Sequence, residues 1–101
     1  MEILGYRRYR APDLDVRFWR TSTGYEVDFV LGDMAVAIEV KGSARVHDAD
    51  LRGLRALVAS HRPLQAVVVC LETVPRTVRP GIAVLPWQLF LDRLWSGELV
   101  G

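Results

Sequence analysis

Two carboxylates and the only lysine of the chain fall close together, in two stretches where polar and apolar residues alternate. Asp28 lies in the stretch 25–31, and Glu39 and Lys41 lie in the stretch 34–41. Two carboxylates can share one hard cation, and Mg²⁺ prefers oxygen ligands while keeping several waters. A metal-bound water is a nucleophile for a phosphodiester, and an ammonium can orient that water or neutralise developing charge. These residue types indicate metal-dependent phosphodiester hydrolysis as one hypothesis.

The two alternating stretches are expected to be neighbouring strands joined by a two-residue turn at 32–33. That register places Asp28 opposite Ala37 and Glu26 opposite Glu39, so that Asp28 and Glu39 are diagonal neighbours roughly 7–8 Å apart. Alternation puts the charged residues on one face of the hairpin. The other face is a predicted core face made of Val27, Phe29, Leu31, Val36, Ile38 and Val40. The solvent-facing side of an ordinary antiparallel sheet carries similar charges, and Glu-x-Lys alone is a weak motif.

The remaining elements follow from periodicity and from turn residues. We expect the end of a helix at 2–10, strands at 16–20, 65–71 and 82–85, a loop at 75–80, a helix between Asp48 and Pro63, and a last helix from Pro86. The continuous apolar run 65–71 is typical of a strand buried on both faces. With 101 residues the chain can form one domain around one modest core. These elements predict an α/β fold with an antiparallel meander.

Composition excludes several classes of protein. The net charge is +1, which gives no overall case for nucleic-acid binding and none against a local patch. The single cysteine, Cys70, excludes an internal disulfide and a cysteine-type zinc site. We find no signal peptide, and no apolar stretch approaches the roughly 20 residues that cross a bilayer. The expectation is a cytoplasmic protein without a membrane segment.

Three segments resemble a known family. They are 18–31, then 37–41 followed by 50–57, and Leu85-Pro86-Trp87 with Phe90-Leu91. Together they are similar to a domain of unknown function found at the C-terminal end of many bacterial and archaeal AAA-type ATPases. The resemblance covers nearly the whole chain. It implies the restriction-endonuclease-like fold of the PD-(D/E)XK superfamily, a mixed sheet with an antiparallel meander plus a parallel strand, flanked by helices.

The resemblance also implies roles for individual residues. Asp28 would bind the metal, Glu39 would be the second acidic ligand, and Lys41 would be the catalytic lysine, with Mg²⁺ or Mn²⁺ as cofactor. Glu2 is the candidate for a further acidic ligand on the first helix. The chain begins where that helix should already be under way, so residues 1–101 are expected to be a single nuclease-like domain with a shortened first helix. No Gly-rich P-loop of the family's ATPase module is present.

Arg45, Arg52 and Arg55 flank the predicted site and could hold a nucleic-acid backbone, although an ordinary polar helix face has the same composition. Three functions remain open. The first is a nuclease. The second is a non-catalytic nucleic-acid- or protein-binding module that works with an AAA-type ATPase, and the third is an assembly domain. Nucleic acid, an AAA-type ATPase and a second copy of the chain are the corresponding partners.

Overall fold

The computed structural model describes residues 16–32, 34–79 and 81–97. Its elements are β1 (Val16–Arg20), β2 (Glu26–Leu31), β3 (Val36–Val40), the 3₁₀ helix η1 (Asp48–Leu51), α2 (Arg52–His61), β4 (Gln65–Cys70), β5 (Arg76–Val78), β6 (Ile82–Pro86) and α3 (Trp87–Ser96). The helix predicted at 2–10 and the candidate ligand Glu2 lie outside the described residues.

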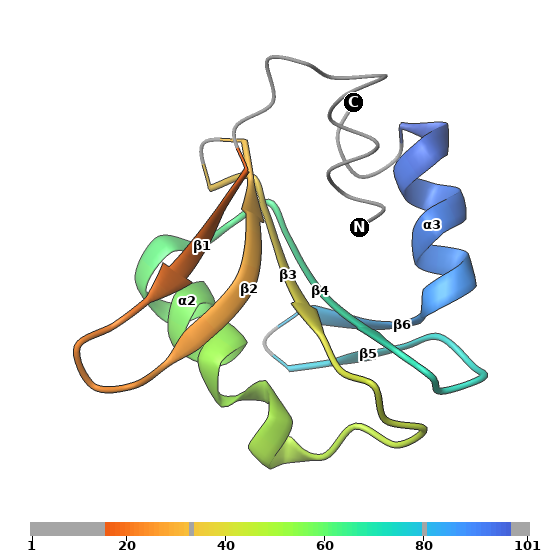
Figure 1. Cartoon of the computed structure of the whole chain (residues 1–101), viewed down its shortest axis with the longest axis horizontal. Coiled ribbons are helices and arrows are strands. Elements are labelled where there is room, and N and C mark those ends of the chain that lie inside the picture. Colours follow the sequence, from red (N-terminus) through yellow and green to blue (C-terminus); the bar gives the residue numbers. More distant parts are fainter. Residues whose placement is uncertain (1–15, 33, 80, 98–101) are drawn as a thin grey trace.

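The strands form one mixed sheet of six, in the order β1-β2-β3-β4-β6-β5. Strands β1, β2 and β3 are the antiparallel meander, β4 runs parallel to β3, and β6 runs parallel to β4 (Figure 1). The predicted α/β class and mixed sheet are therefore confirmed. None of the helices in the described ranges is long and apolar enough to cross a membrane.

One predicted loop is wrong in part. Residues Arg76–Val78, inside the stretch 75–80, form the edge strand β5, which pairs antiparallel with β6. A strand of three residues is too short to show a period-2 pattern in the sequence. It forms because β6 offers unpaired backbone groups at the sheet edge.

Helices cover both faces of the sheet, with α2 on one side and α3 on the other (Figure 1). Along β4, Ala66, Val68 and Cys70 pack on the α2 face, whereas Val67 and Val69 pack on the α3 face. This alternation explains why 66–70 is apolar at every position. It also corrects the prediction of a single core face on the hairpin, because side chains from both faces of β2 and β3 are buried.

The β2–β3 register differs from the predicted one by two residues. Pairing begins with Leu31 opposite Val36, so that residues 32–35 form the connection instead of a two-residue turn. Continuing this register places Asp28 opposite Glu39 rather than diagonal to it. A shift by two preserves the alternation of faces, because side chains alternate with period 2, but Val27 packs on the α2 face rather than on the predicted face with Leu31.

The longer connection has a local cause. Gly32 and Met34 both have left-handed backbone conformations, with φ of 66° and 60°. The Ala35 N–H donates to the Leu31 carbonyl at 3.1 Å, which closes the turn ahead of β3. Glycine adopts this conformation freely and methionine does so at a cost. The methionine gave no sequence signal for such a turn.

Candidate functional site

The site begins at an irregularity in β2. Arg17 pairs with Val30, and Trp19 pairs with Val27. Two residues along β1 therefore match three along β2, so β2 carries one extra residue beside Asp28. Such a β-bulge bends the strand and re-aims side chains. Its effect is visible in the core, because Val27 and Val30 both pack on the α2 face although residues three apart in a regular strand face opposite sides.

The carboxylate of Asp28 reaches across to β3. Its Oδ2 accepts a hydrogen bond from the Val40 backbone N–H at 2.8 Å. The neighbouring N–H, that of Lys41, donates instead to the Val69 carbonyl of β4 at 2.8 Å. Backbone pairing between β2 and β3 ends here, so the Asp28 side chain, instead of a backbone carbonyl of β2, accepts the Val40 N–H. This bond holds one oxygen of Asp28 beside the end of β3.

Glu39 is the buried member of the site, with 7% of its surface exposed. Its carboxyl forms a hydrogen bond with the Asp28 carboxyl and accepts another from the Asp28 backbone N–H. Burial, followed by the hydrogen bond and the negative charge of Asp28, raises the pKa of Glu39 to about 8, and the charge of Lys41 acts in the opposite direction. At neutral pH the carboxyl pair therefore holds a proton between its oxygens.

These side chains open into a groove of about 530 Å³ near the carboxyl end of β3, here called the acidic groove. It is lined by Thr23, Gly24, Tyr25, Glu26, Asp28, Glu39, Val40, Lys41, Ala49, Asp50, Arg52 and Gly53. The three residues singled out in the sequence, Asp28, Glu39 and Lys41, thus share one cavity. Of the three predicted arginines, Arg52 is at its wall.

The other two arginines lie elsewhere. Arg45 lines a second groove, together with residues of the β4–β5 loop. Arg55 forms an ion pair with Asp48 at 3.4 Å and donates to the Arg79 carbonyl at 3.2 Å. Arg55 therefore holds η1 and the β5–β6 turn against α2. Only Arg52 of the predicted arginines is placed to meet a ligand in the acidic groove.

Gly53 allows α2 to form one wall of the acidic groove. A Cβ at this position would lie 2.1 Å from the carbonyl oxygen of Glu26, so only glycine lets the helix approach the start of β2 this closely. Glycine inside a helix costs about 1 kcal/mol relative to alanine. That unfavourable residue in an otherwise good helix is a signal of close approach, which the sequence analysis missed.

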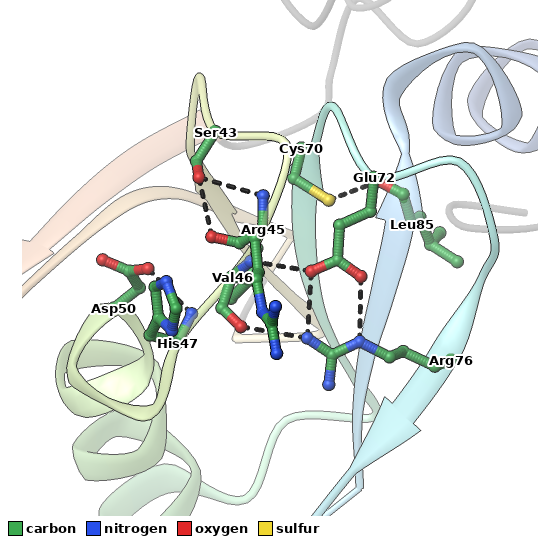
Figure 2. A network of polar contacts seen from close by, with 9 residues as sticks. All are labelled: Ser43, Arg45, Val46, His47, Asp50, Cys70, Glu72, Arg76 and Leu85. Carbon is green, nitrogen blue, oxygen red and sulfur yellow. Dashed lines mark hydrogen bonds and ion pairs between the residues drawn. The ribbon is translucent and has the colours of Figure 1, made fainter.

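A second set of residues missed in the sequence holds the segment that follows Lys41. Arg76 donates from Nε and Nη2 to the two oxygens of Glu72, both at 2.9 Å, and Nη2 also donates to the Val46 carbonyl (Figure 2). Glu72 accepts from the Val46 N–H at 2.7 Å. The Arg76 guanidinium, followed by the Val46 N–H, lowers the pKa of Glu72 to about 2. The spacing of four residues between Glu72 and Arg76 was the sequence signal that could have predicted this ion pair.

The Asp28 and Glu39 carboxyls are in contact with each other, and carboxylate oxygens are the ligands that hard cations such as Mg²⁺ prefer. Asp28 and Glu39 are the residues that would hold the metal, in exchange for the proton that they share. Among the described residues, no group of three or more histidine, cysteine, aspartate or glutamate side chains is arranged to hold a metal ion.

The fold and the groove define a small mixed α/β domain with a carboxylate pair and a lysine beside its central strands. A family model described as a domain of unknown function, DUF4143, matches residues 1–90. The chain therefore belongs to the DUF4143 family. Searches among curated proteins and among solved structures found no match.

Proposed function

We propose that this domain is a metal-dependent nuclease of the restriction-endonuclease-like PD-(D/E)XK type, which hydrolyses phosphodiester bonds of nucleic acid. The observation that supports it is the meeting of Asp28, Glu39 and Lys41 in one groove. The proposed setting is the cytoplasm, in association with an AAA-type ATPase.

Each residue has a distinct part in this proposal. Asp28 and Glu39 would hold Mg²⁺ or Mn²⁺, which would supply a water acidic enough to serve as the nucleophile. The Val40 N–H keeps Asp28 aimed into the groove. Lys41 follows the end of β3, two residues after Glu39, and lines the same groove, so its ammonium is the group proposed to act on the water and the phosphoryl oxygens. It orients the water and stabilises the charge that develops as the bond to the leaving oxygen breaks.

The decisive experiment is cleavage of labelled single- and double-stranded DNA and RNA in Mg²⁺ or Mn²⁺. The native chain is compared with Lys41→Ala and Asp28→Asn, all purified identically. We expect cleavage by the native chain and a loss of at least about 100-fold in each variant, the scale on which one electrostatic group contributes to a rate. Equal cleavage by all three would assign the activity to a contaminant and refute the proposal.

A second candidate is a non-catalytic binding module. It is favoured by the absence of a three-ligand metal cluster among the described residues and by a near-neutral net charge. In this case the chain retains nucleic acid or a protein partner in a chelator and cuts nothing when metal is added. A stable second copy of the chain that binds neither ligand would favour an assembly domain instead.

A further inference from the structure

The acidic groove is lined by one exposed aromatic residue, Tyr25. Tyr25 is 42% exposed and lines the groove between β1 and β2. Among the described residues around the groove it is the one aromatic side chain. Aromatic side chains usually stabilise a fold by burial in a core, whereas this ring is exposed beside a polar cavity.

The backbone of Tyr25 is held firmly while its ring is left free. Its N–H donates to Thr21 Oγ1 at 3.0 Å, and its carbonyl accepts from the Thr21 N–H at 2.9 Å. The turn is closed further by the Gly24 N–H, which donates to the Thr21 carbonyl at 3.2 Å. The turn therefore fixes the backbone that carries the ring, so this backbone need not be ordered when a ligand covers the ring.

The groove combines carboxylates with two basic side chains that can meet a phosphate, Lys41 and Arg52, and it holds no second aromatic ring among the residues that the structure describes. Arg52 is exposed, and its side chain has no hydrogen bond or ion pair with any described residue. Lys41 lines the same groove as Glu39. A cavity of about 530 Å³ has the size of a small-ligand site. It fits one or two nucleotide units and not the full width of a duplex.

From this arrangement we propose that the acidic groove binds single-stranded nucleic acid, with one unpaired base stacked on the Tyr25 ring and an adjacent phosphate held by Arg52. Base faces in a duplex are covered by neighbouring base pairs, whereas splayed bases stack on aromatic side chains. The inference rests on the proposed function for the identity of the ligand, and it names the strand type that this site selects.

The test measures binding of the complete chain in a chelator at low salt, so that no result depends on hydrolysis. Fluorescence anisotropy follows three labelled DNAs: a single strand, its duplex, and the same single strand with abasic positions. The variants are Tyr25→Leu, which keeps apolar bulk without a flat ring, and Tyr25→Phe, which keeps the ring. Trp87→Leu is the matched control, because Trp87 is 46% exposed and lies outside the acidic groove.

We expect Tyr25→Leu to weaken single-strand binding about 5- to 100-fold, the range for one stacked base. Tyr25→Phe and Trp87→Leu should stay near the native affinity. The abasic strand should bind more weakly than the intact one and should not respond to Tyr25→Leu. These results would hold whether or not the chain cuts DNA in metal.

Four outcomes would overturn the inference. They are an unchanged affinity in Tyr25→Leu, an equal loss for duplex and single strand, an equal loss in Trp87→Leu, and no detectable single-strand binding by the native chain. Urea unfolding establishes that each variant is folded. If Tyr25→Leu does not fold, the native chain alone decides, because equal affinity for intact and abasic strands excludes stacking.

Discussion

At the scale of single residues, the contact between Asp28 and Glu39 dominates the site. Ionising both of two carboxyls in contact costs free energy because their charges repel, so the more buried carboxyl keeps its proton. Here the buried partner is Glu39, whereas Asp28 receives the Val40 N–H. A divalent cation bound as proposed above would replace this proton. This arrangement makes stability depend on pH in a way that can be measured.

The first prediction concerns Glu39 in the absence of metal. Its pKa is about 8 in the folded chain against 4.5 for an unperturbed glutamate. Between these values the folded state holds a proton that the unfolded state has released. The contribution of Glu39 to stability is therefore full below pH 4.5 and is lost as pH rises through 8, with a slope of at most about 1.4 kcal/mol per pH unit. Urea unfolding across this range measures the slope.

Glu39→Gln is the matched variant, because glutamine keeps the size and a hydrogen bond to Asp28 but does not titrate. We expect the native chain to lose stability relative to this variant as the pH increases. Parallel stability profiles for the two proteins would contradict the raised pKa of Glu39.

At the scale of elements, the groove depends on how closely α2 and β2 approach. The bulge in β2 turns Asp28 toward β3, and Gly53 brings the first turn of α2 against Glu26. On the other side, Glu72 and Arg76 hold Val46 and with it the segment that follows Lys41. The first contact lies within the lining of the groove, and the second fixes a segment beside it.

Gly53→Ala tests the approach of helix and strand. The added methyl would meet the Glu26 carbonyl oxygen at 2.1 Å, so the helix must shift. We expect a loss of about 1–3 kcal/mol in the free energy of unfolding, although alanine is the better helix former. Gly42→Ala is the control, because nothing lies within 4 Å of a Cβ there, and it should be near neutral. A stabilised Gly53→Ala chain would mean that α2 and β2 are further apart.

Glu72→Gln tests the contact between the segment 43–47 and β5. The folded pKa of Glu72 is about 2, below the ordinary 4.5, so its contribution is present above pH 4.5 and is lost as pH falls toward 2. We expect a loss of about 1–2 kcal/mol at neutral pH that disappears in acid. This is less than for a fully buried pair, because the Arg76 side chain is 43% exposed.

Glu26→Gln is the comparison for that measurement. It breaks an ion pair with Arg20 in which the two side chains are 59% and 62% exposed. Such a surface pair contributes less than about 1 kcal/mol. Equal losses in Glu26→Gln and Glu72→Gln would show that the Glu72 contact is an ordinary surface pair.

At the scale of the whole molecule, the sheet is covered on both faces and the acidic groove lies where this cover ends. The α2-face cluster continues along the sheet from Val27 to Val84, while Glu39 is the one buried charged residue among those described. A ligand held by Asp28 and Glu39 would therefore join β2 to β3 at their weakest-paired point. Binding there should increase the free energy of unfolding of the whole domain.

Metal binding is predicted to raise the melting temperature. Free metal at ten times its Kd adds about 1.4 kcal/mol, which is several degrees for a domain of this size. Thermal unfolding in Mn²⁺ or Mg²⁺, against sodium chloride of equal ionic strength, should show this shift in the native chain. Asp28→Asn should abolish it. An equal shift in both proteins would place the metal elsewhere.

The sequence is enough to predict which candidate residues share one face of a strand. Glu39 and Lys41 are two residues apart, so any strand that contains them puts both on the same face. The apolar run at 65–71 likewise predicted a strand buried on both sides, and the periodicity predicted α2 and α3. These inferences succeeded because they depend on short-range geometry, which the chain carries locally.

Tertiary structure alone decided how Asp28 meets Glu39. The register of a hairpin depends on the pairing of both strands and on the connection between them, and here the connection is four residues, 32–35. The bulge beside Asp28 arises from pairing with β1, and β5 exists only through β6. Long-range packing also explains why only one of the three predicted arginines lines the groove. Arg55 pairs with Asp48 of η1, and Arg45 lies beside the β4–β5 loop, so neither points into the groove. Contacts between distant segments set these positions, and no local pattern encodes them.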